Sequence, residues 1–140
     1  MKSISILLVD DDEIDVQVVL RALKDQKIAN PVQVAGDGIE ALEIMRGENG
    51  QKKIVEPYMV LLDINMPRMN GFEFLDEIRR DPALRKTVVF VLTTSEADED
   101  IIRAYERNVA GYIVKGKAGD DFLRAAEMLD LYWKLVESPV

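Results

Sequence analysis

Five short segments rich in β-branched and other apolar residues are spaced along the chain, and this spacing limits the possible fold more than any other feature. They span residues 4–9, 31–35, 58–62, 88–92 and 111–114. Each is followed by a stretch in which apolar residues recur with the period of a helix. Strands that alternate with helices, and that are apolar along most of their length, are typical of a parallel sheet covered on both faces.

The helical stretches predict which side chains face the sheet. In chain order, these are Ile14, Val18, Val19, Ala22 and Leu23; Ile39, Leu42 and Met45; Phe72, Leu75 and Ile78; and Ile101, Ile102 and Tyr105. A fifth helix is expected over residues 119–137. Five β–α units in 140 residues predict one α/β domain, residues 1–140, with an extended C-terminal helix. The expected architecture is a flavodoxin-like, doubly wound, five-stranded parallel sheet, (βα)5.

Polar residues follow the predicted strands at the points where each strand ends. Asp10, Asp11 and Asp12 follow the first strand, and Asp63 ends the apolar run of the third; Thr93, Thr94 and Lys115 follow the fourth and fifth. In open α/β sheets, ligands bind beyond the carboxyl ends of the strands. Carboxylates gathered there would repel one another unless a cation lay among them. A divalent cation with oxygen ligands, Mg²⁺ above all, is therefore expected.

The composition of the chain excludes several kinds of chemistry and argues against one class of ligand. The chain has no His and no Cys, which excludes thiol catalysis, disulfides and thiolate zinc sites and removes the commonest general base. Its net charge of −8 argues against nucleic acid as a ligand. The apolar runs are shorter than the ~20 residues that a membrane span needs, and the N-terminus lacks the features of a secretory signal. We therefore expect a cytoplasmic protein without a membrane segment.

With these residues in place, the chain resembles a response-regulator receiver domain of two-component signalling. Asp63, Met66, Pro67 and Gly71 match the phosphoacceptor loop of that family, and the acidic residues after the first strand match its metal site. The resemblance implies that Asp63 accepts a phosphoryl group from a sensor histidine kinase. It also implies that Mg²⁺ is held by Asp10, Asp11, Asp63 and the backbone carbonyl of Asn65. Asp10 would act largely through a bound water.

The same resemblance assigns roles to the remaining polar residues. Lys115 is expected to contact the phosphoryl group, and the Thr93 hydroxyl to move toward it. Tyr112 would follow Thr93 inward and couple the site to the surface of the fourth helix, the fifth strand and the fifth helix. Asn65 and Ser95 occupy positions that affect dephosphorylation. Such a protein is a signalling protein rather than an enzyme, since it catalyses only its own phosphorylation and dephosphorylation.

The sequence departs from the family at one position, and three other interpretations can be compared with its residues. Most receivers have proline after the lysine, whereas this chain has Gly116, which leaves room for a degenerate receiver that binds partners without phosphorylation. A flavin-binding protein would not place three aspartates where a flavin phosphate must lie. A haloacid-dehalogenase-like phosphatase needs a second aspartate two residues after the first, and Asn65 occupies that position.

The C-terminal region predicts how the protein associates. Met128, Leu131 and Leu135 form an apolar stripe beside the one that would face the sheet, which favours a homodimer through this helix or through the neighbouring surface. The segments VLTTSEADEDI and LYWKLVESP are similar to small single-domain regulators that partner phytochrome-type light-sensing kinases. No output domain is expected, so the signal would pass by protein contact or by phosphoryl relay.

Overall fold

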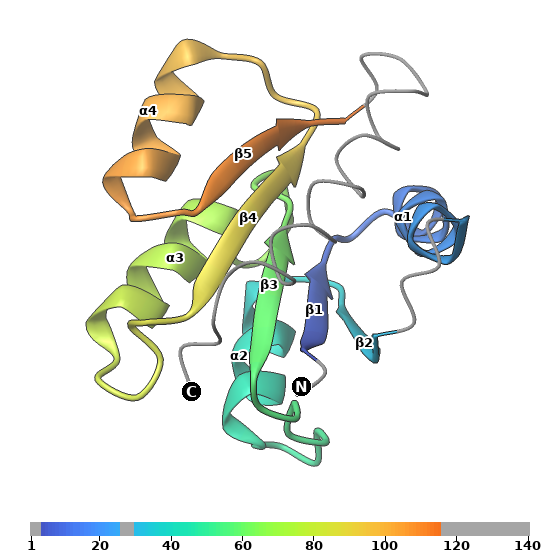
Figure 1. The fold of residues 1–140 in the computed structure, drawn as a ribbon. Coiled ribbons are helices and arrows are strands. Elements are labelled where there is room, and N and C mark those ends of the chain that lie inside the picture. The colour runs from blue at the N-terminus through green and yellow to red at the C-terminus, as the bar shows by residue number, and fades with distance from the viewer. Residues whose placement is uncertain (1–3, 26–29, 116–140) are drawn as a thin grey trace.

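A computed structural model describes residues 4–25 and 30–115. Five parallel strands form one sheet in the order β2-β1-β3-β4-β5, as the predicted fold requires (Figure 1). The strands are β1 (Ser5–Val9), β2 (Val32–Ala35), β3 (Tyr58–Leu62), β4 (Val88–Thr93) and β5 (Gly111–Val114). The helices are α1 (Glu13–Asp25), α2 (Gly38–Arg46), α3 (Gly71–Arg80) and α4 (Asp98–Glu106). The predicted strands agree with the observed ones to within one residue at each end.

The sheet separates two apolar cores, which explains why the central strands are apolar on both faces. Alternate residues of β1, such as Leu7 and Val9, pack with α2, α3 and α4, while Ile6 and Leu8 pack with α1. Figure 1 shows α1 on one side of the sheet and the other three helices on the opposite side. Burial on both faces removes the polar alternation that a half-exposed strand would show.

The predicted inner faces are confirmed for α3 and corrected for α1 and α4. Phe72, Leu75 and Ile78 are buried as expected. In α1, however, Ile14 is 76% exposed and Val18 is 48% exposed; the buried residues of this helix are Val16, Val19, Ala22 and Leu23. The apolar residues of α1 cover more than one face, so their period alone does not identify the face that packs on the sheet.

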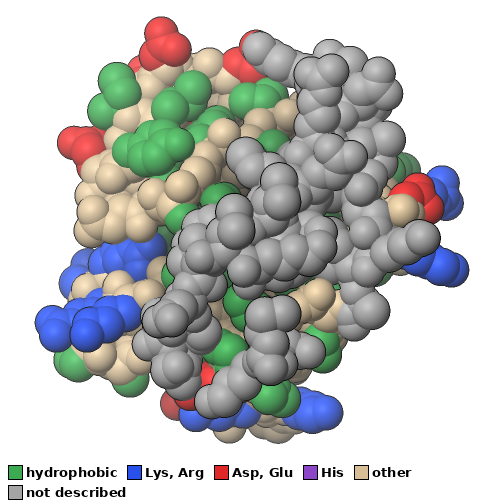
Figure 2. Space-filling model, in the orientation of Figure 1, with side chains coloured by type: hydrophobic (Ala, Val, Ile, Leu, Met, Phe, Trp, Pro, Cys, Tyr) green, Lys and Arg blue, Asp and Glu red, His purple; other side chains and the backbone are tan. Residues whose placement is uncertain are grey.

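The fourth helix leaves its large apolar side chains at the surface. Ile102 is 60% exposed and Tyr105 is 50% exposed, whereas Ala104 is buried. Figure 2 shows hydrophobic side chains gathered on the surface over α4. Ile39 of α2 is likewise at the surface, 37% exposed, although Leu42 and Met45 of that helix are buried as predicted.

Two other expectations concern the membrane and the C-terminal region. Among the described residues, none of the helices combines the length and the apolar character needed to cross a membrane. The expected fifth helix, its apolar stripe and Gly116 lie outside the described residues. The extent of the domain, residues 1–140, therefore stays a prediction.

Arg79 joins three segments at the amino-terminal end of β4, and its removal is expected to destabilise the fold. Its guanidinium donates to four backbone carbonyls at 2.8–3.0 Å, those of Arg85, Thr87, Arg107 and Asn108. Hydrogen bonds from a charged donor are stronger than neutral ones, although water can replace part of the loss at exposed carbonyls. We expect Arg79→Met to lower the free energy of unfolding by about 2 kcal/mol, measured by urea denaturation.

Arg80, the next residue of α3, provides the matched control for this prediction. Its side chain is 70% exposed and pairs with Glu77 at 2.9 Å within the same helix. An exposed pair of this kind contributes little, so Arg80→Met should change the free energy of unfolding by less than about 0.5 kcal/mol. Equal effects of the two substitutions would contradict the role given to Arg79.

Candidate functional site at the carboxyl edge of the sheet

The register of the sheet brings the predicted polar residues to one edge. Val9 pairs with Leu62, so the residues that follow them, Asp10 and Asp63, leave the sheet side by side. The Asp63 backbone N–H donates to the Val9 carbonyl at 2.9 Å, which extends the ladder to the aspartate itself. On the other side of β4, the Lys115 backbone N–H donates to the Thr93 carbonyl at 2.7 Å. The site is therefore built on the rigid ends of four strands.

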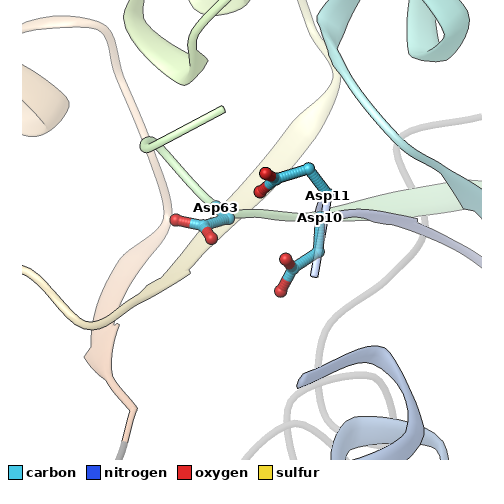
Figure 3. A group of neighbouring side chains, drawn as sticks. All are labelled: Asp10, Asp11 and Asp63. Atoms are coloured by element: carbon cyan, nitrogen blue, oxygen red, sulfur yellow. The ribbon is translucent and has the colours of Figure 1, made fainter. Parts of the chain in front are cut away.

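Three carboxylates form the centre of this edge. Asp10, Asp11 and Asp63 each place a carboxylate oxygen within 4.8 Å of the others, and Figure 3 shows the three side chains projecting into a common space. Asp10 and Asp63 are buried, whereas Asp11 is exposed. A set of three carboxylate oxygens, with one exposed member for access, fits a hard divalent cation. These side chains are the ones predicted from the sequence as metal ligands.

Asp63 is held in one orientation by two hydrogen bonds to the same oxygen. Thr93 Oγ1 donates to Asp63 Oδ1 at 2.9 Å, and the Asn65 backbone N–H donates to it at 3.1 Å. Thr93, the last residue of β4, is fully buried, while Thr94, the first residue after the strand, is exposed. The two residues predicted for the site are therefore in direct contact, and the movement of Thr93 toward a phosphoryl group stays a prediction. Whether the Asn65 carbonyl ligates a cation stays a prediction.

Lys115 lies among three carboxylates rather than beside one. Its Nζ is 2.7 Å from Asp10 Oδ2, 3.1 Å from Asp15 Oδ2 and 3.5 Å from Asp63 Oδ2, and its side chain is 7% exposed. Burial lowers the pKa of Lys115, but the hydrogen bond to Asp10 and the charges of Asp63 and Asp10 outweigh it and raise the pKa above its ordinary value. The ammonium therefore stays protonated.

Burial has the larger influence on Asp10. It raises the pKa of this carboxyl, and the hydrogen bonds from Lys115 and from the Asp12 backbone offset the effect only in part. The Lys115 ammonium interacts with three carboxylates at once, whereas those carboxylates share a single positive charge. A cation bound at the same edge would favour the ionised form of Asp10 further.

Asp12 and Asp15, the next aspartates along the chain, have different roles. Asp12 lies just before α1, and its Oδ1 accepts from the backbone N–H groups of Ile14 and Asp15, so it caps the helix. Asp15 reaches back to Lys115 from within the helix. Sequence reasoning missed Asp15, because an acid near a helix start is usually explained by the helix dipole.

Tyr112 is connected to the loop after β4. Its hydroxyl donates to the Ser95 backbone carbonyl at 2.9 Å, and Ser95 Oγ donates to Asp100 Oδ2 of α4 at 2.5 Å. The pKa of Tyr112 is raised, first by burial. These contacts connect β5, the β4–α4 loop and α4 directly, and the loop follows Thr93, the last residue of β4.

The loop between β3 and α3 is fixed at both ends. Asn70 and Glu73 form a reciprocal capping box at the start of α3. At the same point, a Cβ on Gly71 would lie 2.5 Å from Ile64 Cα, so the close approach of two backbones requires glycine. In the middle of the loop, Arg68 is bound to Asp37 at 2.6 Å, a pair that nothing in the sequence indicated.

A pocket of about 490 Å³ opens beside the carboxylates. It is lined by Asp11, by the loop residues Ile64, Asn65, Met66, Pro67 and Asn70, and by Phe72, Asp100 and Arg103. The Arg103 guanidinium lies over the Phe72 ring, 4.0 Å from its centroid. The pocket gives the exposed member of the carboxylate group a route to solvent.

Comparison with known proteins identifies the family. The response regulator receiver domain profile matches residues 6–127. A probable methanogenesis regulatory protein, FilR2 of Methanothrix harundinacea, is 36% identical over 91% of this chain and 82% of its own length.

Two solved structures extend the likeness to the fold. The phosphorylated cyanobacterial phytochrome response regulator RcpA is 30% identical, with a TM-score of 0.88 over 99% of this chain and 100% of its own. The Mn²⁺-bound form of response regulator Rcp1 is 31% identical, with a TM-score of 0.85 over 97% of this chain and 99% of its own. Sequence, fold and the arrangement of the carboxylates agree, and the chain belongs to the response regulator receiver domain family.

Proposed function

We propose that the protein is a phosphoaccepting response regulator in which Asp63 receives a phosphoryl group from a sensor histidine kinase. The observation that carries this proposal is the environment of Asp63. Asp63 is 8% exposed at the end of a buried strand, and its carboxylate is bound by Thr93 and near Lys115, with two further carboxylates beside it. A strand end presents the nucleophile rigidly, and phosphoryl transfer depends mainly on alignment and charge stabilisation.

Each residue of the site has its own role in the proposed reaction. An oxygen of Asp63 attacks phosphorus as the bond to the donor's leaving group breaks, which gives an acyl phosphate. Oδ2 is suited to this role, because Oδ1 already accepts from Thr93 and from the Asn65 backbone. The Lys115 ammonium and the Thr93 hydroxyl are positioned to contact the phosphoryl oxygens that Asp63 then carries.

The carboxylates would hold a divalent cation, which we expect to be Mg²⁺. Asp11 and Asp63 are the proposed direct ligands together with the Asn65 backbone carbonyl, and Asp10 would act largely through a water. When bound, the ion offsets negative charge on the carboxylate and on the phosphoryl group. The exposed position of Asp11 and the pocket beside it support access from solvent.

We propose that phosphorylation is read out through the β4–α4 loop. A phosphoryl group on Asp63 would offer Thr93 a new acceptor, and movement of Thr93 would shift the loop that begins there. Tyr112 and Asp100 both contact Ser95 in this loop, so the movement would reach β5 and α4. The exposed Ile102 and Tyr105 of α4 are available there to a second copy of the chain or to another protein.

The partner and the assembly are proposed from the relatives and from the exposed apolar surface. A receiver implies a histidine kinase, and the likeness to RcpA and to other phytochrome-linked regulators supports a phytochrome-type kinase. We also propose a homodimer through the α4–β5 surface or the C-terminal helix, with no nucleic-acid ligand and a cytoplasmic location. Catalysis would be limited to the protein's own phosphorylation and dephosphorylation.

Metal dependence of phosphorylation tests this proposal. After incubation with acetyl phosphate and Mg²⁺, intact-mass spectrometry should show one phosphoryl group per chain, and EDTA should reduce the rate at least about a hundredfold because the repulsion between carboxylate and phosphate is no longer offset. Equal phosphorylation in EDTA would contradict the metal site. A folded protein that acquires no phosphoryl group, from acetyl phosphate or from a kinase, would instead support the degenerate receiver.

A further inference from the structure

Three carboxylate oxygens lie within 3.5 Å of Lys115 Nζ, and one of them does not belong to the carboxylate group described above. The ammonium donates hydrogen bonds to Asp10 Oδ2 at 2.7 Å and to Asp15 Oδ2 at 3.1 Å, and it forms a longer ion pair with Asp63 Oδ2 at 3.5 Å. Asp10 and Asp63 are members of the group that can hold a cation, whereas Asp15 is not. Asp15 projects from the first turn of α1, on a different element from either, and is 35% exposed.

The proposed reaction would change the interactions of Lys115 with Asp10 and Asp63. A cation at the site would interact with the carboxylates of Asp10 and Asp63, and a phosphoryl group would be bonded to an oxygen of Asp63. The carboxylate of Asp15 stays available throughout.

We propose that Asp15 is a positioning residue that holds the Lys115 ammonium at the phosphoacceptor site while the other carboxylates are engaged. This inference rests on the proposed function and adds a residue to it. An ion pair held before the reaction costs no reorganisation when phosphoryl charge develops. Asp15 would act through Lys115 and touch neither the cation nor the phosphoryl group.

The first test compares phosphorylation rates at saturating Mg²⁺ with acetyl phosphate as the donor. Asp15→Asn should lower the rate about fivefold, because the ammonium is less well placed. Asp15→Glu, which keeps the carboxylate, should stay within about twofold of the wild type. Glu13→Gln is the matched control: it removes the same charge from the same turn of α1, and Glu13 is exposed, so the rate should stay unchanged.

A second comparison asks whether the effect of Asp15→Asn depends on Lys115. Such dependence would distinguish positioning of the lysine from a general effect of the lost charge. In a Lys115→Met background, Asp15→Asn should change the remaining rate by less than about twofold, since the residue through which it acts is gone. The same loss in both backgrounds, an equal loss in Glu13→Gln, or no loss in Asp15→Asn would overturn the inference.

A second measurement tests the pair without phosphorylation. Thermal unfolding of wild type, Asp15→Asn, Lys115→Met and the double variant should show a coupling of about 2 °C in the melting temperatures, whereas the matching set with Glu13→Gln should be additive. Absence of coupling would overturn the inference whatever the rates show. If wild type is not phosphorylated at all, the proposed function fails, and this cycle still decides whether Asp15 holds Lys115.

Discussion

Asp63→Asn is expected to abolish phosphorylation while leaving the fold intact. Asparagine keeps the shape of the side chain and an oxygen that can accept from Thr93 and from the Asn65 backbone, so the local hydrogen bonds survive. The substitution removes the anionic oxygen that attacks phosphorus, which no neighbouring group replaces in the same place. The rate with acetyl phosphate and Mg²⁺ should fall at least about a thousandfold, measured by intact-mass spectrometry.

Asp11→Asn provides the comparison that separates the nucleophile from a metal ligand. Asp11 is exposed and lies within 4.8 Å of the other two carboxylates, so its loss should weaken the cation rather than remove the acceptor. Raising the Mg²⁺ concentration should therefore restore phosphorylation in Asp11→Asn and not in Asp63→Asn. Recovery of both variants would show that another residue accepts the phosphoryl group.

Gly71→Ala is expected to have the largest effect on stability. The added Cβ would lie 2.5 Å from Ile64 Cα and 3.0 Å from the Asp63 carbonyl oxygen, and backbone atoms cannot move aside as the end of a flexible side chain can. We expect the free energy of unfolding in urea to fall by about 3 kcal/mol or more. Because the displaced segment carries the phosphoacceptor, any folded fraction should also be phosphorylated more slowly, by about a hundredfold.

Gly36→Ala is the matched control for this prediction. A Cβ at Gly36 has no heavy atom within 4 Å, so the substitution should change the free energy of unfolding by less than about 0.5 kcal/mol. If Gly71→Ala were equally harmless, the close approach of the two backbones would not be a requirement of the fold.

The parts of this site that follow directly from strand ends could be predicted from the sequence. Asp10, Asp63, Thr93 and Lys115 each follow a short apolar segment, and the topology of a parallel sheet brings such positions to one edge. Asn70 could be predicted as a helix cap from residue type and spacing, and the capping box confirms it. In each case a local pattern and a general rule of topology are sufficient.

The contacts between helices and loops could not be predicted in the same way. Asp15 meets Lys115 across 100 residues of sequence, and Arg68 meets Asp37 from a different loop. Both acids lie beside helix starts, where a local explanation is already adequate. Ile14 and Ile102 are exposed for a related reason, because the period of an apolar pattern does not say which of two faces the sheet will cover.

Location of the phosphoryl group tests the central claim most directly. Wild-type protein would be phosphorylated with acetyl phosphate and Mg²⁺ and then treated with sodium borohydride, which reduces an acyl phosphate to the alcohol and converts a phosphorylated aspartate to homoserine. Peptide mass spectrometry should find homoserine at position 63 and at no other aspartate. Homoserine at another position, or a phosphoryl group that resists this reduction, would contradict the assignment of Asp63 as the acceptor.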